Sequence, residues 1–233
     1  MSENLAHALE TGAIEIEGRL IDASNATLFG KITTPDGPIS VVYKPIAGER
    51  PLWDFPDGNL ASREVAAYRI SRNRFDLVPL TVLRDGPFGI GAVQQWIETA
   101  ENFDPITFGT SQNAQLRRLV LFDVVINNTD RKFGHILLDS EGRLFGCDHG
   151  VSFHEEWKLR TVLWQFAGMV LTEEEIEILR NTKDSILSGN LVLNDLINNS
   201  EVSATLERID LLLKEQIFPQ PDQDWPAVPW PPV

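Results

Sequence analysis

Two short polar segments on either side of a predicted β-hairpin constrain this chain more than any other feature. Residues 127–135 follow an apolar run and contain Asp130, and residues 147–150 contain Asp148. The residues between them, 136–145, predict two short strands joined by a turn. Asn, Asp and Gly are also ordinary turn residues, so either carboxylate alone would indicate only a loop. The two together, in this order and separated by a hairpin, predict a functional pair.

This arrangement of carboxylates is typical of phosphoryl transfer. That reaction needs one aspartate to orient the attacking hydroxyl and a second, with a partner ligand, to hold a metal on the phosphates. Asp130 fits the first role, and Asp148 with His135 fits the second. An imidazole is a poor Mg²⁺ ligand and suits softer ions, so His135 favours Mn²⁺. We interpret His149 and His154 as loop residues that form hydrogen bonds.

A lysine and a glutamate upstream complete the pattern. Residues 39–45 alternate and are rich in β-branched side chains, which predicts a strand with Lys44 near its end. Residues 61–73 predict a helix, in which Glu64 shares the apolar face. A strand lysine that faces a helix glutamate positions nucleotide phosphates in kinases. Each residue alone is also consistent with a solvated surface position.

The order of these residues resembles the order of the motifs in the phosphatidylinositol 3-/4-kinase branch of the protein-kinase-like fold. The resemblance is greatest to the type II phosphatidylinositol 4-kinases. Those enzymes have a Lys-Pro dipeptide like the one that begins at Lys44. Their helix motif is similar to residues 63–68, their Asn-Thr-Asp-Arg loop to residues 128–131, and their Asp-Asn-Gly loop to residues 148–150. The whole chain also resembles an actinobacterial family related to these kinases, and the shared motifs span about residues 40–165.

The resemblance implies a role for each matching residue. Lys44 would bind the α- and β-phosphates, and Glu64 would pair with it. Asp130 would be the catalytic base, Lys132 would lie near the γ-phosphate, and Asp148 would bind the metal. The relatives mostly carry asparagine where this chain has His135, which changes the second metal ligand.

Three further groups of residues are candidates for binding. The chain has no Gly-x-Gly-x-x-Gly motif, so the turn over the phosphates would be residues 22–27, with donors from Ser24 and Asn25. The segment 94–98 is the expected hinge, where adenine would contact the backbone; the alternative is an edge strand. The hinge candidates are Gln95, Trp96 and Ile97. The candidate substrate-binding cations are Arg131, Lys158 and Arg160; the last two are alternatively surface cations at a helix start.

The predicted fold class is α+β: a small bilobal protein-kinase-like fold, with an antiparallel sheet and one helix in the N-lobe and a mainly helical C-lobe. We place the N-lobe at residues 1–98, the C-lobe at 99–217 and a Pro- and Trp-rich tail at 218–233. The C-lobe helices include residues 111–125, a helix capped by Thr172 and another capped by Ser200. The tail favours polyproline II and either docks on the body or binds a partner.

Composition excludes some classes of protein. The formal net charge is −14, spread along the chain, which weighs against binding to nucleic acid or an anionic membrane surface. The first residues lack the pattern of a signal peptide, and no apolar run is long enough for a transmembrane segment. The single cysteine, Cys147, excludes an intrachain disulfide and is interpreted as a small buried apolar residue. We therefore expect a cytoplasmic protein.

The sequence predicts an ATP-dependent kinase that uses Mg²⁺ or Mn²⁺ and transfers the γ-phosphoryl group to a hydroxyl. Its acceptor is open among a lipid, an inositol-like small molecule and a protein, and so is its oligomeric state. One alternative is a pseudokinase, a nucleotide-binding scaffold, which His135 and the missing glycines favour. Another is nucleotidyl transfer to a protein, with the nucleotide reversed in the cleft.

Overall fold

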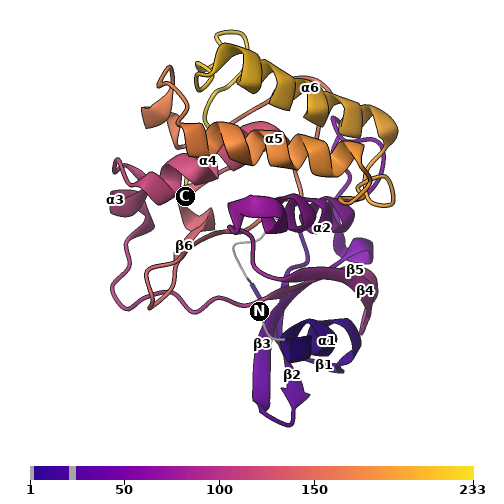
Figure 1. The fold of residues 1–233 in the computed structure, drawn as a ribbon. Coiled ribbons are helices and arrows are strands. Elements are labelled where there is room, and N and C mark those ends of the chain that lie inside the picture. The colour runs from indigo at the N-terminus through magenta and orange to yellow at the C-terminus, as the bar shows by residue number, and fades with distance from the viewer. Residues whose placement is uncertain (1–2, 21–24) are drawn as a thin grey trace.

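A computed structural model describes residues 3–20 and 25–233 of the chain. One end of the molecule is a β-sheet, the other is a group of helices, and helix α2 lies between them (Figure 1). The apolar residues of both parts form one continuous core. Within the described residues, no helix is long and apolar enough to cross a membrane.

The sheet has five antiparallel strands in the order β1-β2-β3-β5-β4. Its strands are β1 (Ile14–Arg19), β2 (Leu28–Thr34), β3 (Gly37–Pro45), β4 (Thr81–Gly86) and β5 (Gly89–Gln95). β3 is central and its side chains alternate in direction, so Val41 and Tyr43 are buried in the core. Lys44 pairs with Ala92 and faces the other way from these two residues, toward the helical part of the molecule.

Two helices pack against this sheet, whereas the sequence predicted one. Helix α2 (Leu60–Ile70) begins at Asn59, whose side chain caps it, and the Glu49 carboxylate accepts from the N–H groups of Leu60 and Ala61 at 2.9 and 2.8 Å. The sequence did not predict α1 (Glu3–Thr11). This short helix depends on tertiary packing, since its Leu9 is fully buried in the core.

The rest of the chain is mainly helical, with a two-stranded hairpin. Its elements are α3 (Pro105–Gly109), α4 (Ala114–Ile126), β6 (Ile136–Leu138), β7 (Leu144–Gly146), α5 (Glu173–Leu187) and α6 (Asn199–Glu215). The capping box at Thr172 is confirmed. The predicted cap at Ser200 is wrong, because Asn198 caps α6 in a capping box with Glu201.

An ion pair joins α2 to the helical part. Arg63 of α2 pairs with Glu201 of α6 and also donates to the backbone oxygen of Ser152 at 3.0 Å. Both ionic side chains are buried, so each compensates the charge of the other. Helix α2 is therefore fixed both to the sheet and to the helices, which sets the position of Glu64.

Candidate functional site

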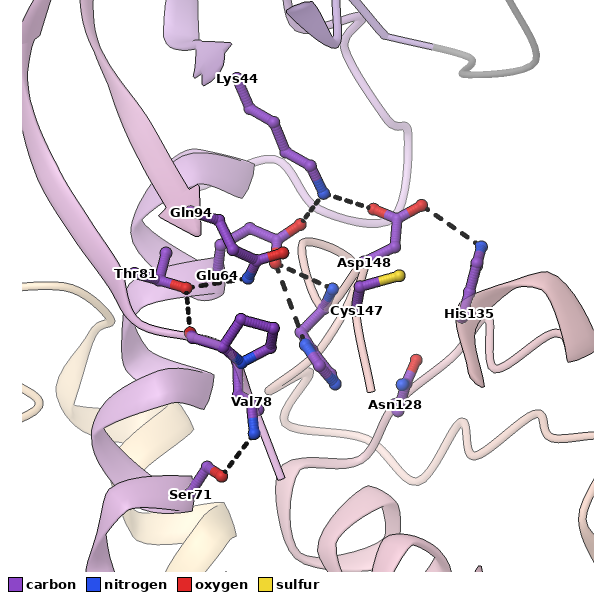
Figure 2. A network of polar contacts seen from close by, with 12 residues as sticks. Lys44, Glu64, Ser71, Val78, Thr81, Gln94, Asn128, His135, Cys147 and Asp148 are labelled. Carbon is purple, nitrogen blue, oxygen red and sulfur yellow. Dashed lines mark hydrogen bonds and ion pairs between the residues drawn. The ribbon is translucent and has the colours of Figure 1, made fainter. Parts of the chain in front are cut away.

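A lysine held between two carboxylates is the centre of the candidate site. Lys44 Nζ pairs with Glu64 of α2 and lies 2.9 Å from Asp148 Oδ1. On its other side, Asp148 Oδ2 lies 3.4 Å from His135 Nε2. Figure 2 shows this chain of contacts from β3 through α2 to the two loops that flank the β6–β7 hairpin.

These contacts determine the charges in the site. Burial alone would lower the pKa of Lys44, but Asp148 and Glu64 outweigh it and raise that pKa above its ordinary value. Lys44 in turn holds the pKa of Asp148 far below its usual range. Burial raises the pKa of Glu64, against the effect of Lys44. The site therefore combines one cation with a carboxylate that stays ionised at neutral pH.

Asp148 is both exposed and held in an unusual backbone conformation. Its side chain is 53% exposed, and its φ of 59° lies in the left-handed region, which aspartate tolerates better than most residues. The following loop packs tightly on α2, since a Cβ at Gly150 would lie 3.1 Å from the Cβ of Leu60. His149 N–H donates to Glu64 Oε2 at 3.0 Å. The loop and α2 are thereby locked together, and Asp148 is directed toward Lys44.

Asp130 and Lys132 lie on the neighbouring loop. Lys132 Nζ is 3.4 Å from Asp130 Oδ2, and the Asp130 side chain is 29% exposed. Burial raises the pKa of Asp130, while Lys132 opposes that shift. The backbone N–H of Asp130 donates to Asn128 Oδ1 at 3.0 Å, which fixes the loop. Asp130 is thus an accessible carboxylate with a raised pKa, as a base requires.

A buried network beneath the loops contains residues that the sequence analysis did not assign. Asp123 of α4 accepts from Arg131 at 2.8 and 2.9 Å and from Asn128 at 2.9 Å. Arg131 also donates to the backbone oxygen of Cys147 at 3.0 Å and contacts His149 Nε2 at 2.7 Å. The available signal was Asp123 itself, a lone carboxylate within the apolar sequence of α4.

The network corrects one prediction. Arg131 was a candidate substrate-binding cation, but its side chain is fully buried and does not reach the cleft. A buried guanidinium needs a carboxylate partner, and Asp123 supplies it from the adjacent helix. Arg131 therefore connects the Asp130 loop to the Asp148 loop.

A cavity of about 790 Å³ lies beside Lys44 and between the two parts of the chain. Its lining includes Lys44, Lys132, His135, Cys147 and Asp148, as well as the segment from Gln94 to Thr99. Of the predicted hinge residues, Gln95, Trp96 and Ile97 all line it. Trp96, however, donates its backbone N–H to Ser40 at 3.0 Å. Burial raises the pKa of Cys147 to about 12, so it is a neutral thiol.

The remaining candidates lie around this centre. Asn25 accepts from the backbone N–H of Arg50 at 2.9 Å, and Ser24 lies outside the described residues. Lys158 is buried, with Asp54 and Glu156 carboxylate oxygens at 3.8 and 3.6 Å. Arg160 donates to the backbone oxygen of Thr129 at 2.6 Å, next to Asp130. His154 contacts Lys158 Nζ at 3.1 Å, consistent with a hydrogen-bonding role.

The residues present can contribute to a divalent metal site but do not complete one. Across residues 3–20 and 25–233, no group of three or more His, Cys, Asp or Glu side chains is arranged to hold a metal. Asp148 offers a hard oxygen ligand, and burial lowers the pKa of His135 to about 4, which leaves a neutral ring nitrogen at pH 7. Two protein ligands completed by phosphate oxygens and water are typical of nucleotide-bound metals. The donor set therefore fits a metal that arrives with a nucleotide.

A second and larger groove has no part in this arrangement. It has a volume of about 980 Å³ and lies on another face of α2, between β4 and the segment after α5. Arg69, Arg72 and Arg84 line it, and none of the candidate catalytic residues does. The candidate site instead uses the cavity of about 790 Å³, and Asp130 lines a small pocket next to it, which Lys44 and Asp148 also line.

The fold is similar to that of a kinase. The crystal structure of the Helicobacter pylori proinflammatory kinase CtkA superposes with a TM-score of 0.53, covering 90% of this chain and 94% of that one at 12% identity. At that identity the likeness shows the fold alone, and it confirms the predicted bilobal α+β class. The antiparallel sheet with α1 and α2 is the N-lobe, and the mainly helical part is the C-lobe.

Sequence comparison places the chain more narrowly. It belongs to the same family as the Mycobacterium tuberculosis protein Rv2133c, with 37% identity over 261 aligned positions that cover 96% of this chain and 93% of that protein. Phosphatidylinositol 4-kinases gamma 7 and gamma 5 of Arabidopsis thaliana are each 29% identical over 162 and 163 residues, or 53% of this chain. The matches span only 24% and 25% of those plant proteins. No family model matches the chain.

Proposed function

We propose that this protein is an ATP-dependent phosphotransferase that moves the γ-phosphoryl group to a hydroxyl. The observation that carries the proposal is the position of Lys44, paired with Glu64 and Asp148 at the edge of the cavity that Asp148 and the Gln94–Thr99 segment line. The likeness to phosphatidylinositol 4-kinases supports it, and a specific relation to the type II enzymes stays a prediction.

Lys44 is the residue that would bind the phosphates. Its two carboxylate partners keep it protonated, so it offers a fixed positive charge at neutral pH. Glu64 is almost completely buried and bonded to the backbone of His149, so its position does not depend on a ligand. Phosphate oxygens would replace Asp148 as one partner of Lys44, which frees that carboxylate for a cation.

Asp148 and His135 are the residues that would hold a divalent metal. When bound there, a divalent cation neutralises charge on the transferred phosphoryl group. The protein's own contribution is to fix the Asp148 carboxylate, through its left-handed backbone and the Gly150 contact with α2. Because one ligand is an imidazole nitrogen, we expect Mn²⁺ to serve at least as well as Mg²⁺.

Asp130 and Lys132 are the residues that would act on the acceptor side. Asp130 is accessible, and its raised pKa makes it a better proton acceptor than a solvated aspartate. Lys132, in contact with it, would compensate the charge of the γ-phosphate. Asp130 is a group that orients the acceptor hydroxyl, so it would contribute little to holding ATP.

The segment after β5 would bind the adenine and join the two lobes. We place the boundary at residues 98 and 99, with the tail from 218 onward. Because the N–H of Trp96 is already bonded to Ser40, backbone contacts to adenine would come from Ile97 and the residue after it. Ala100 then bonds to Leu138 of β6 at 2.7 Å, which attaches the segment to the C-lobe.

A pseudokinase is the second candidate, and one observation favours it. Among the described residues there is no group of three metal-ligating side chains, and His135 offers a nitrogen where the kinases that the chain resembles mostly carry asparagine. A protein of this kind would bind the nucleotide through Lys44 and transfer nothing.

Nucleotide binding is tested first, by thermal denaturation. ATP with Mn²⁺ or Mg²⁺ should raise the melting temperature, because a ligand that binds only the folded state stabilises it. Lys44→Ala should reduce that rise while the protein stays folded. If millimolar ATP, with Mn²⁺ or with Mg²⁺, does not shift the melting curve of the unmodified protein, the proposal is wrong.

The Asp130→Ala variant then distinguishes an active enzyme from a pseudokinase scaffold. We expect this variant to bind ATP as the unmodified protein does but to lose phosphoryl transfer by roughly 10²-fold or more, as expected for a positioned base. Slow hydrolysis of γ-labelled ATP measures transfer until incubation with cell extract identifies the acceptor. Equal hydrolysis by both proteins, with ATP bound by each, would favour the pseudokinase.

A further inference from the structure

The Pro- and Trp-rich tail runs along the acceptor side of the candidate site. The backbone oxygen of Ala227 accepts from Thr161 N–H at 3.0 Å and from Trp164 Nε1 at 2.8 Å. Farther along, the backbone oxygen of Pro232 accepts from Phe133 N–H at 2.9 Å. The tail is thus bound, through its carbonyl groups, by the segment after the Asp148 loop and by the Asp130 loop itself.

Two side chains bring the tail close to Asp130. The Trp225 ring lies 5.4 Å from Lys158 Nζ and 5.9 Å from Arg160 Cζ, so it covers both predicted substrate-binding cations. Arg160 is bonded to Thr129, the residue before Asp130. From the other direction, Val233 lines the same cavity as Lys132. The tail therefore contacts Phe133 and Arg160, which lie beside the Asp130 loop, and leaves the Asp130 side chain 29% exposed.

The composition of the tail suits a covering segment better than an acceptor. Residues 219–233 contain no Ser, Thr or Tyr, so they offer no hydroxyl for phosphorylation, and they contain no Lys or Arg. Six of these residues are prolines, which restrict the free chain and so reduce the entropy lost on docking. The segment can occupy the acceptor surface without being consumed by the reaction.

We propose that residues 219–233 form an intrasteric strap: the chain's own tail occupies a peptide-binding surface beside the Asp130 loop and must leave before a protein acceptor binds there. This inference rests on the proposed phosphotransferase function and describes how that function would be regulated. The strap covers Lys158 and Arg160, and within the strap only Val233 lines the cavity beside Lys44, so its main effect would be on the acceptor and not on the nucleotide.

Two tryptophans of the strap give a matched pair of full-length variants. Trp225 contacts both cations, whereas Trp230 is 88% exposed. Trp225→Ala should raise the rate of transfer from γ-labelled ATP to the proteins of a cell extract roughly fivefold or more, within the usual range of coupling between sites, at unchanged ATP affinity and unchanged ATP hydrolysis. Trp230→Ala should match the unmodified protein.

A synthetic peptide of residues 221–233 tests the surface without relying on catalysis. By isothermal titration calorimetry, the peptide should bind the Trp225→Ala protein, whose own strap is loosened, more tightly than the unmodified protein. The same peptide should return the rate of transfer to protein by Trp225→Ala toward that of the unmodified protein. A peptide that itself carries Trp225→Ala should bind more weakly and restore less.

The outcomes separate the strap from the underlying function. If Trp225→Ala binds ATP but transfers its γ-phosphoryl group to protein no faster than the unmodified protein, the strap is wrong; a slower rate of transfer would mean that the tail completes the site. Failure of every protein to bind ATP would instead overturn the proposed function. In that case peptide binding alone would decide whether the surface accepts the tail.

Discussion

Two pairs of an aspartate and a cation lie close together in this molecule, yet they differ in almost every physical respect. In the first, Asp123 and Arg131 are 1% and 0% exposed and form two hydrogen bonds of 2.8 and 2.9 Å. In the second, Lys44 and Asp148 are 20% and 53% exposed and meet at 2.9 Å. We call the first the closed pair and the second the open pair.

The difference shows how the fold holds an exposed carboxylate in place. The closed pair has satisfied its bonding capacity inside the protein, and Arg131 also holds the backbone of Cys147 and the ring of His149. These residues flank Asp148, so the closed pair positions the open one. Asp148, in contrast, keeps much of its surface accessible for a metal or another ligand. We therefore expect the closed pair to determine folding and the open pair to determine binding.

Removal of Asp123 should have the largest effect. Asp123→Ala leaves Arg131 buried and unpaired, so we expect the free energy of unfolding to fall by about 3–5 kcal/mol. Urea denaturation measures this change. The matched control is Glu174→Ala, which breaks the exposed pair with Arg118 and should cost at most about 1 kcal/mol. Equal effects of the two variants would show that the closed pair does not support the fold.

Removal of the open carboxylate should affect binding more than stability. Asp148→Asn should weaken metal–ATP binding by about tenfold to a hundredfold, the scale of one or two charged hydrogen bonds. Because Lys44 keeps Glu64 as a partner and Asp148 is half exposed, stability should change by less than about 1 kcal/mol. Calorimetric titration and urea denaturation measure the two quantities. A variant that loses stability but still binds ATP would reverse the assignment of the two pairs.

The histidines beside the two pairs predict a dependence of stability on pH. Burial lowers the pKa of His135 to about 4 and that of His149 well below its ordinary value, whereas both would titrate near about 6.5 when unfolded. Between these values the unfolded chain binds more protons, so stability should fall as pH falls from 6.5 toward 4. The slope should reach at most about 1.4 kcal/mol per pH unit for each histidine.

One variant isolates the histidine contribution. Glu64, whose pKa burial raises, contributes with the opposite sign, but it is unchanged in His135→Asn. The slope of the unfolding free energy against pH should therefore be smaller in His135→Asn, by the amount that one histidine contributes to it. Urea denaturation from pH 5 to 7 measures the slopes. Identical slopes in the two proteins would show that His135 is not held neutral by the fold.

The same variant has the smallest expected effect when the metal is changed. His135→Asn should shift the relative affinity for Mg²⁺–ATP over Mn²⁺–ATP by about threefold to tenfold, the scale of one polar contact. Parallel titrations with the two metals measure the ratio. An unchanged ratio would mean that His135 does not bind the metal. Of the two proposed ligands, Asp148 alone would then remain.

Most of the secondary-structure elements that carry the candidate site could be predicted, because local sequence patterns determine them. Alternation along residues 39–45 predicted β3, which places Lys44, and the apolar face of residues 61–73 predicted the buried position of Glu64. The β6–β7 hairpin between the two aspartates was confirmed. Helices α1 and α3 were missed because they have nine and five residues, too short for a clear period.

The errors arose where a residue's environment depends on distant parts of the chain. Arg131 was predicted to face a substrate, and the structure buries it against Asp123. Ser200 was predicted to cap α6, and Asn198 does so because Glu201 completes its capping box. Trp225 carries no local signal that it will contact Lys158, 67 positions earlier in the sequence. Each outcome depends on which surfaces pack together.

The sequence by itself determined the order of the chemistry: a strand lysine, a helix glutamate and two loop aspartates around a hairpin. Local periodicity and turn chemistry are enough for this, because they act between residues a few positions apart. Only the tertiary structure decided that Asp123 is buried against Arg131 while Asp148 stays exposed, and that the tail returns to the Asp130 loop. Those choices depend on burial and on ion pairs such as Lys44–Asp148, whose partners are far apart in the chain and are brought together by packing of the core.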